Sequence, residues 1–239
     1  MKRRAGLFCM MLVLLLLPVG NRDSVAVGGG GVVRLPDRIP LVALTFDDGP
    51  RPDTTGALLD GLALREVPAT FFLVGERIEG SEELLLRMKQ EGHQIGIHTY
   101  DHVLMTQLSR AEFEEQLALT RSRLGEVLGE GEYWLRPPYG IVNDDVLRWA
   151  DGPLILWSVD PEDWKDSDED RIVSSVLAKV EDGDIILMHD IYHSSVHAAL
   201  RIVDELLEQG YCFVTVEQLM EVRQVQPEKG KVYLSLPPK

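Results

Sequence analysis

From Leu41 onward, the sequence alternates short apolar segments, rich in β-branched residues, with longer segments of helical periodicity. Strands and helices that alternate in this way form parallel sheets, because each helix returns the chain to the end of the sheet where it started. No G-x-G-x-x-G follows the first strand, which disfavours an open nucleotide-binding sheet. The pattern predicts an α/β fold, a distorted or incomplete (β/α) barrel with about seven parallel strands. These strands are expected over residues 41–46, 69–74, 94–97, 133–135, 153–159, 184–188 and 211–216.

The helix signals between these strands are clearest over residues 110–128. Ser109 precedes this segment, and Glu112 follows three residues later, which is the pattern of a capping box. Gly129 is the expected stop of this helix, because glycine readily adopts the backbone conformations that end helices. Further helices are expected between Ser81 and Gly92 and over residues 197–209.

The N-terminus has the layout of a secretory signal. Basic residues at positions 2–4 are followed by an apolar segment over residues 7–17, which Pro18 and Gly20 close. This segment is shorter than the roughly 20 residues of a comfortable membrane-spanning helix, so a cleaved signal is favoured over a permanent anchor. We expect an extracytoplasmic protein, which is secreted, held in the cell wall or tethered to the membrane by its N-terminal segment.

The chain divides into four parts: a signal peptide or N-terminal membrane anchor (1–26), a glycine-rich linker (27–38), one globular domain (39–223) and a C-terminal extension (224–239). The extension is either docked on the domain or disordered, and the sequence leaves both open. A hydrophobic share of 45% in 239 residues is enough for one domain with a substantial core. The net charge of −15 disfavours nucleic acid as a partner, and we assume a monomer.

Two adjacent carboxylates, Asp47 and Asp48, stand at the end of the first expected strand. In a parallel barrel the carboxyl ends of the strands meet on one face, where catalytic side chains lie. Neighbouring residues at a strand end can point in different directions, so one aspartate can bind a metal ion while the other stays free as a base. Gly49 and Pro50 follow, and a plain turn is the alternative.

His98 and His102 follow the third expected strand. Two imidazoles four residues apart can converge on one ion if the chain turns helically after the strand. With Asp48 they form a set of two histidines and one carboxylate, which leaves coordination positions open for water and substrate. The alternative is that one histidine caps a helix and the other lies on the surface.

Arg136 begins a stiff loop after the fourth expected strand, in which Pro137 and Pro138 restrict the backbone and Gly140 permits a tight turn. Such a loop can hold a backbone N–H in a fixed place. Arg136 brings a permanent positive charge to the strand ends and can orient a neighbouring aspartate. A structural ion pair is its alternative role.

His189 follows the sixth expected strand, and Asp163 follows the fifth. A carboxylate beside an imidazole favours the protonated ring, which makes the histidine a competent general acid. A histidine at the end of an apolar strand can also be a core residue with satisfied hydrogen bonds. The presence of Asp163 favours the catalytic interpretation.

These residues lie in five short motifs that resemble, in the same order, those of the polysaccharide deacetylase family, the NodB-homology carbohydrate esterases of family four. The resemblance covers residues 41–216, so it implies that the domain over residues 39–223 is catalytic. Five motifs in order at strand ends make coincidence negligible. The motifs are residues 45–50, 98–102, 136–140, 160–164 and 187–190.

The resemblance implies a divalent metal ion held by Asp48, His98 and His102. Zinc is the first expectation for this ion, with cobalt, nickel and manganese as alternatives. On the same basis, Asp47 is the catalytic base and Arg136 positions it.

For the other half of the site, the resemblance implies that His189 is the catalytic acid, tuned by Asp163. The backbone N–H of Tyr139 would help to hold the oxyanion. Trp164 and Leu187 would form apolar walls around the acetyl methyl group.

The activity implied is metal-dependent hydrolysis of N-acetyl groups from an amino-sugar polymer, with release of acetate. N-acetylglucosamine of peptidoglycan is favoured as the substrate, because export suggests a cell-wall glycan, and chitooligosaccharides come next. One alternative is an esterase that removes O-acetyl groups, as from acetylated xylan. The other is a non-catalytic carbohydrate-binding protein, against which the complete set of base, acid and metal ligands argues.

Overall fold

The computed structural model describes residues 39–238. The expected signal peptide or anchor (1–26) and the linker (27–38) lie outside the described residues. Among the helices that the structure describes, none combines the length and the apolar character needed to cross a membrane.

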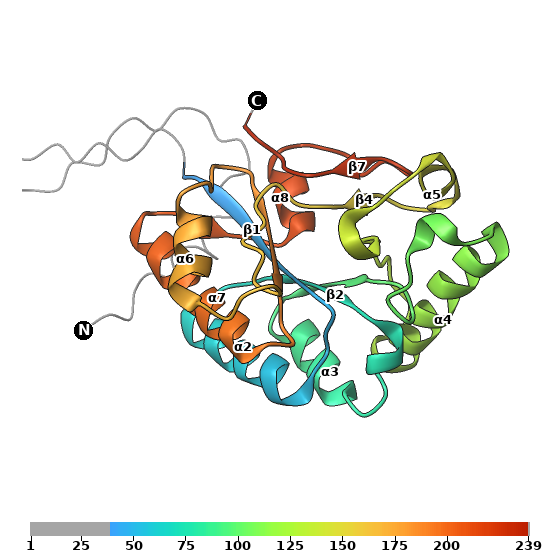
Figure 1. Ribbon diagram of the computed structural model, residues 1–239, viewed down its shortest axis with the longest axis horizontal. Helices are drawn as coiled ribbons and strands as arrows, with labels where there is room; N and C mark the ends of the chain where they lie inside the picture. The colour runs from blue at the N-terminus through green and yellow to red at the C-terminus, as the bar shows by residue number, and fades with distance from the viewer. Residues whose placement is uncertain (1–38, 239) are drawn as a thin grey trace, which may run out of the picture.

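A parallel sheet runs through the middle of the molecule (Figure 1). Its strand order is β3-β2-β1-β5, and β6 pairs with the beginning of β1. Every residue of β1 is buried, as expected of a strand at the centre of a parallel sheet. The strands are β1 (Leu41–Asp47), β2 (Thr70–Leu73), β3 (Gln94–Ile97), β5 (Ile185–His189) and β6 (Cys212–Phe213).

The register of the sheet brings the carboxyl ends of its strands together. Asp47, the last residue of β1, pairs with His189, the last residue of β5. On its other side, Asp47 pairs with Phe72 of β2, and the next residue of β2 pairs with Ile97 at the end of β3. Neighbouring strands lie about 4.8 Å apart. Side chains at these strand ends are therefore close enough to form one site.

A second sheet of two strands contains β4 (Leu154–Ile155) and β7 (Val232–Tyr233). Single bridges from Ile97 to Leu135 and from Leu135 to Leu154 connect it to the end of the larger sheet. The α/β fold with a parallel sheet is as predicted. Among the described residues no continuous ladder closes the strands into a barrel, although a single bridge from Val159 to Ile186 also links the second sheet's segment to β5.

Three of the expected strands are shorter than their apolar patterns suggest. Residues 133–135 contribute only a bridge at Leu135, and residues 153–159 contribute β4 and a bridge at Val159. Residues 211–216 contribute only the two residues of β6. Apolar residues in these segments are buried against the core, and burial produces the same sequence pattern as a strand without requiring a continuous ladder.

The predicted helix over residues 110–128 is confirmed with its capping box. The Glu112 carboxylate accepts a hydrogen bond from the Ser109 N–H at 2.8 Å, the Ser109 hydroxyl accepts from the Glu112 N–H, and Gly129 ends the helix. The helix expected after Ser81 is also present, and the one expected from residue 197 begins earlier, at His193. The α-helices described are α2 (Pro52–Arg65), α3 (Glu82–Gln90), α4 (Arg110–Leu128), α5 (Asp144–Trp149), α6 (Glu169–Leu177), α7 (His193–Glu208) and α8 (Val216–Val222).

The main hydrophobic core lies between the large sheet and helices α2, α3 and α7, which line one side of it in Figure 1. Phe46 of β1 stacks on Phe71 of β2 with ring centroids 5.3 Å apart. Leu58 and Leu62 of α2 and Ile202 of α7 are fully buried in the same cluster. This packing holds β1, β2 and β5 rigidly, so that the residues at their ends have fixed positions.

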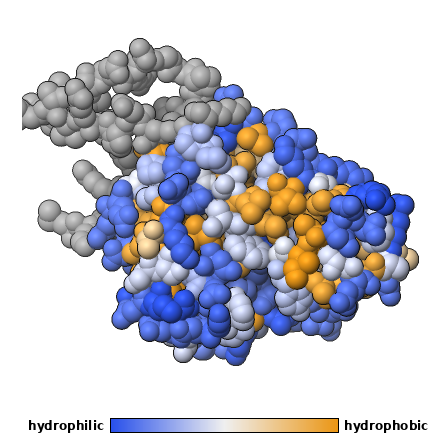
Figure 2. All heavy atoms as spheres, turned by 45° about the horizontal axis from the view of Figure 1, so that its top comes forward, coloured by the Kyte–Doolittle hydropathy of each residue, from blue (hydrophilic) through white to orange (hydrophobic). Residues whose placement is uncertain are grey.

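The C-terminal extension is docked on the domain. Tyr233 of β7 and Leu236 are each 5% exposed. The backbone N–H of Leu236 donates to the Gly183 carbonyl at 2.7 Å, and its carbonyl accepts from Arg223 Nε at 3.0 Å. Leu234 is half exposed, and Figure 2 shows an apolar area among hydrophilic side chains on the face that carries β4 and β7. Residues 224–238 are thus part of the folded unit.

Candidate active site

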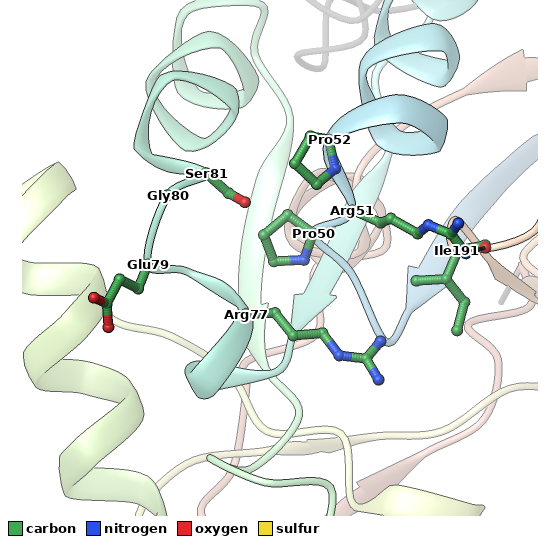
Figure 3. Close-up of a pocket in the computed structure, with 8 residues that line it drawn as sticks. All are labelled: Pro50, Arg51, Pro52, Arg77, Glu79, Gly80, Ser81 and Ile191. Carbon is green, nitrogen blue, oxygen red and sulfur yellow. Dashed lines mark hydrogen bonds between the residues drawn. The ribbon is translucent and has the colours of Figure 1, made fainter.

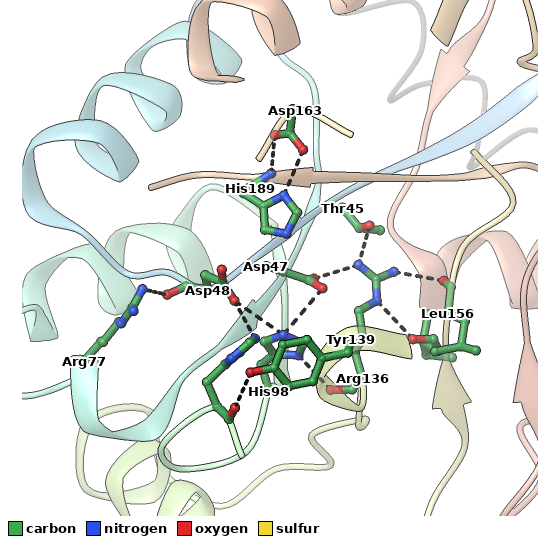
Figure 4. Close-up of polar contacts among 12 residues, drawn as sticks. Thr45, Asp47, Asp48, Arg77, His98, Arg136, Tyr139, Leu156, Asp163 and His189 are labelled. Atoms are coloured by element: carbon green, nitrogen blue, oxygen red, sulfur yellow. Dashed lines mark hydrogen bonds and ion pairs between the residues drawn. The ribbon is translucent and has the colours of Figure 1, made fainter. Parts of the chain in front are cut away.

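Asp47 and Asp48 point in different directions at the end of β1, as the sequence predicts (Figure 4). Asp48 has a φ angle of 72°, in the left-handed region that residues with a side chain rarely adopt. This turn sends the Asp48 carboxylate toward the histidines, whereas the buried Asp47 carboxylate faces Arg136. Two neighbouring carboxylates therefore have separate surroundings.

The side chains of Asp48, His98 and His102 converge. Asp48 Oδ1 lies 3.5 Å from His98 Nε2 and 3.2 Å from His102 Nε2. The chain between the two histidines is not helical, contrary to the condition expected from their spacing. Thr99 and His102 instead have φ angles of 62° and 59°, and these two left-handed residues turn the second imidazole back toward the first.

The donor set fits a divalent cation. One potential ligand atom from each of Asp48, His98 and His102 lies within 4.8 Å of the others. His98 Nδ1 lies 2.8 Å from the Arg136 carbonyl, so Nδ1 carries the proton and Nε2 keeps its lone pair for a metal. Asp48 Oδ1 is buried and has no well-aligned hydrogen-bond donor among the described residues. Such a group of lone pairs is costly to bury together without a cation.

The charge state of Asp48 also suits a metal ligand. Burial alone would raise the pKa of this carboxyl. Contact with His102 and the electrostatic influence of the neighbouring imidazoles, including the protonated His189, outweigh burial and lower the pKa to about 2. The carboxylate is therefore ionised at neutral pH.

Arg136 is completely buried and holds Asp47 in place. Its Nη1 donates at 2.7 Å to both Asp47 Oδ1 and the Thr45 hydroxyl. Nε and Nη2 donate to the carbonyls of Ile155 and Leu156, each at 3.0 Å. Arg136 thus fixes Asp47 Oδ1. The second oxygen, Asp47 Oδ2, faces the group formed by Asp48, His98 and His102 and lies 3.7 Å from His98 Nε2.

His189 lies on the opposite side of Asp47 and is backed by Asp163, as the sequence predicts. Its Nδ1 is 2.8 Å from Asp163 Oδ1, and its backbone N–H donates to Asp163 Oδ2, also at 2.8 Å. Burial of the imidazole would lower its pKa. The hydrogen bond and charge of Asp163, together with Asp47 and Asp48, outweigh burial and raise the pKa of His189 to about 9. The ring is therefore protonated at neutral pH, with Nε2 free.

The positions of the three remaining predicted site residues, Tyr139, Trp164 and Leu187, define their roles less directly. Tyr139 has a φ angle of 63° and is 59% exposed, and its ring meets that of His102 edge-on with centroids 4.8 Å apart. Trp164 is 51% exposed beside the buried Asp163. Leu187 is only 3% exposed, in register with Thr45. The roles given to Tyr139, Trp164 and Leu187 remain predictions.

Two supporting contacts have no strong signal in the sequence. Arg77 Nη1 donates to the Asp48 carbonyl at 2.6 Å and anchors the backbone of the β1–α2 loop. Asp190 is fully buried, and one of its oxygens accepts a hydrogen bond from the Thr55 hydroxyl at 2.5 Å. A side chain at Gly49 would collide with the Asp190 carboxylate, so that glycine is the only sequence trace of this contact. Burial raises the pKa of Asp190 to about 7, despite the Thr55 hydrogen bond.

A site that combines a fixed carboxylate, a protonated imidazole and a group of side chains that fits a cation suits the hydrolysis of an unactivated bond. The class that the fold and this geometry define is therefore that of the α/β metallohydrolases. The chain belongs to the polysaccharide deacetylase family, since the sequence model of that family matches residues 35–151 and relatives of this family share about 40% of the aligned residues.

Two curated relatives illustrate this similarity. Peptidoglycan-N-acetylmuramic acid deacetylase PdaC of Bacillus subtilis is 43% identical over 189 residues, which cover 79% of this chain and 40% of the relative. Peptidoglycan-N-acetylglucosamine deacetylase PgdA of Listeria monocytogenes is 40% identical over 178 residues, which cover 74% and 38%. This chain therefore spans about two fifths of the length of these relatives.

Solved structures confirm the fold. T48 deacetylase with substrate has a TM-score of 0.78 and 41% sequence identity, and the match covers 82% of this chain and 96% of that chain. A family 4 acetyl xylan esterase from Clostridium thermocellum in complex with a cobalt ion has a TM-score of 0.79 and 31% identity, with 82% and 99% covered. Both matches extend over nearly all of the described residues.

Proposed function

We propose that this chain is a metal-dependent polysaccharide deacetylase that removes N-acetyl groups from an amino-sugar polymer and releases acetate. Peptidoglycan N-acetylglucosamine is the first substrate to expect, and chitooligosaccharides are the second. The observation that carries the proposal is that Asp47 and His189, paired at the ends of β1 and β5, lie beside the group formed by Asp48, His98 and His102. The names of the relatives, which are peptidoglycan deacetylases, support the substrate class.

Asp48, His98 and His102 would hold the metal ion. When bound, a divalent cation acidifies water and polarises an acyl carbonyl. Zinc suits two imidazoles and one carboxylate, and cobalt, nickel and manganese are the alternatives. The cobalt ion in the related esterase structure supports a divalent ion of this kind.

Asp47 would act as the base. Its Oδ1 is held by Arg136, and its Oδ2 is free to accept a proton from the attacking water. Arg136 also fixes the orientation of the Asp47 carboxylate, because three further hydrogen bonds hold the guanidinium in place. The attack produces a tetrahedral oxyanion, which the backbone N–H of Tyr139 would help to stabilise.

His189 would act as the acid. The protonated ring has its Nδ1–H bound by Asp163, which leaves the Nε2–H to donate to the nitrogen of the leaving amine. The sugar then keeps a free amine, and acetate leaves. Trp164 and Leu187 would enclose the acetyl methyl group with apolar surface.

We also propose that the protein works outside the cytoplasm, as a secreted, wall-bound or membrane-tethered enzyme. The pattern of residues 1–26 supports this location, and so does the location of peptidoglycan itself. Fractionation of cells that express the full chain tests it, and recovery of all the protein in the cytoplasmic fraction would refute it.

Acetate release by the purified protein tests the proposed activity. The substrates are chitooligosaccharides, peptidoglycan and acetylated xylan, each assayed before and after a chelator and again after added zinc. Release from the first two that is lost with the chelator and restored by zinc would support an N-deacetylase. Release from xylan alone would support an O-acetyl esterase, for which the similarity to the acetyl xylan esterase is the favouring observation. Folded, metal-loaded protein that releases no acetate would favour carbohydrate binding without catalysis.

A further inference from the structure

A cavity of about 400 Å³ lies next to the proposed active site, on the far side of the β1–α2 loop (Figure 3). Pro50 and Arg51 of this loop form one wall, and Arg77 forms another. Pro50 is two residues after Asp48, and Arg77 contacts the Asp48 carbonyl. The cavity and the group formed by Asp48, His98 and His102 are therefore connected through one loop.

Two arginines, Arg51 and Arg77, line this cavity, and both have donors without an acceptor among the described residues. Arg77 is half-buried, and only its Nη1 has an acceptor among the described residues, the carbonyl of Asp48. Arg51 Nη1 donates to the Ile191 carbonyl at 3.0 Å, and Nε donates to Asp53 at 3.0 Å. Each guanidinium has five N–H donors, so both retain donors for a ligand.

The charge around these arginines points to an anion. Arg77 has no carboxylate partner within the described part of the chain, although the protein as a whole carries a net charge of −15. Glu79 also lines the cavity, but Figure 3 shows it on the far side from both guanidinium groups, and it lies 4.0 Å from Arg123. A half-buried guanidinium without a negatively charged partner is unfavourable unless a ligand accepts its remaining hydrogen bonds. Carboxylates match the geometry of the guanidinium.

The lining also has an apolar part, next to the polar side chain of Ser81. Pro50, Pro52 and Ile191 provide surfaces without hydrogen-bond donors. A ligand that fits them has a small hydrocarbon part next to its negative charge. Neutral sugars, such as those of chitooligosaccharides, have no such group. Every N-acetylmuramic acid unit of peptidoglycan carries a lactyl ether with a methyl group, and its carboxyl is free where the stem peptide has been removed and amide-linked to the carboxylate-bearing stem peptide where it has not.

The geometry points to a binding site for a carboxylate carried by N-acetylmuramic acid, next to the sugar that is deacetylated. This inference rests on the proposed function and adds the feature that would distinguish peptidoglycan from chitin-like substrates. The carboxylate is either that of the lactyl group or one from the stem peptide attached to it. Both present a carboxylate close to the glycan chain.

Replacement of Arg51 tests this inference, because Arg51 touches none of the proposed catalytic groups. We expect Arg51→Gln to raise KM for peptidoglycan glycan strands about tenfold, the size of one lost charged contact, with kcat unchanged. Kinetics on chitooligosaccharides should not change. The matched control is Arg110→Gln, which removes an exposed arginine paired with Glu114 on α4 and should alter neither substrate.

The glycan strands are used in two forms, with the stem peptides attached and with the peptides removed to expose the lactyl carboxylate. An increase in KM on the stripped strands assigns the lactyl group, and an increase only on the substituted strands assigns the peptide. An equal change on chitooligosaccharides, or no change on either form of peptidoglycan, overturns the inference. Failure of the unaltered protein to release acetate from any of these substrates would instead refute the proposed function.

Discussion

At the scale of single residues, the site depends on the different surroundings that the fold gives to two chemically identical carboxylates. Asp47 and Asp48 are neighbours, yet Arg136 holds one and two imidazoles face the other. The left-handed φ of Asp48 produces this division, because it turns the second side chain away from the first. Substitutions at the two positions should therefore have different effects.

Asp47→Asn should lower acetate release by about 10²–10⁴-fold, the range for loss of a general base, without loss of metal. His98→Ala should lose the metal, because it removes one of three ligands. Metal content and acetate release, measured on the same purified samples, distinguish the two effects. Metal-loaded Asp47→Asn with unaltered activity would refute the assignment of the base.

The proposed acid makes turnover sensitive to alkaline pH. Since His189 has a pKa of about 9, turnover should fall as the pH rises through that value. The same pKa lies above the ordinary value of 6.5, so the folded state binds this proton more tightly. Its contribution to the free energy of unfolding is complete below pH 6.5 and is lost as the pH rises through about 9.

Asp163→Asn should move the alkaline limit of kcat to lower pH by about 1–3 units, because it removes the charge that counteracts burial. The measurement is a pH profile of kcat at saturating substrate. Asp170→Asn, at an exposed position paired with Arg201, is the control and should leave the profile in place. An unchanged profile in Asp163→Asn would contradict the role of Asp163.

At the scale of elements, helix ends give a direct test of local sequence signals. The capping box of α4 satisfies the N–H of Glu112 and that of Ser109. Ser81 also precedes a helix, α3, but its side chain makes no capping hydrogen bond. The same residue type thus stands at two helix starts with different local contacts.

Ser109→Ala should lower the free energy of unfolding by about 1 kcal/mol, because an orphan N–H at the start of α4 loses its partner. Ser81→Ala serves as the matched control and should have a smaller effect. Urea unfolding followed by circular dichroism measures both. Equal effects for the two variants would show that the capping bond contributes nothing particular to α4.

At the scale of the whole molecule, the C-terminal extension completes the second sheet. Tyr233 is buried in β7, and its hydroxyl donates to the Gln226 carbonyl and accepts from the Glu228 N–H, both at 3.1 Å. The next residue, Leu234, is half exposed. The two neighbours therefore report separately on packing and on surface hydrophobicity.

Tyr233→Ala should lower the free energy of unfolding by about 3 kcal/mol, because it leaves a cavity and breaks two hydrogen bonds. Leu234→Ala should change it by less than about 0.5 kcal/mol. Thermal unfolding of both variants provides the comparison. Similar melting temperatures for the two would contradict the docking of the extension.

The sequence by itself determined the α/β class and the bounds of α4, and it predicted the polar side chains that meet at the ends of the strands. Periodicity, capping patterns and strand ends are local features, so they can be recognised in the sequence without knowledge of the tertiary structure. The contacts of Arg136 with Asp47 and of Asp163 with His189 were anticipated because all four residues end or follow expected strands. Parallel strands necessarily bring such ends to one edge.

Only the tertiary structure decided how these residues converge. Three features could not be predicted from local patterns, because each depends on contacts between separate segments. They are the left-handed turns at Thr99 and His102, the Arg77 contact with Asp48 and the docking of β7. The apolar segments over residues 133–135 and 211–216 resemble full strands, yet they form little ladder. Burial and strand pairing favour the same side chains, so the sequence reveals which residues are buried, whereas register and packing across the whole molecule decide which of them pair.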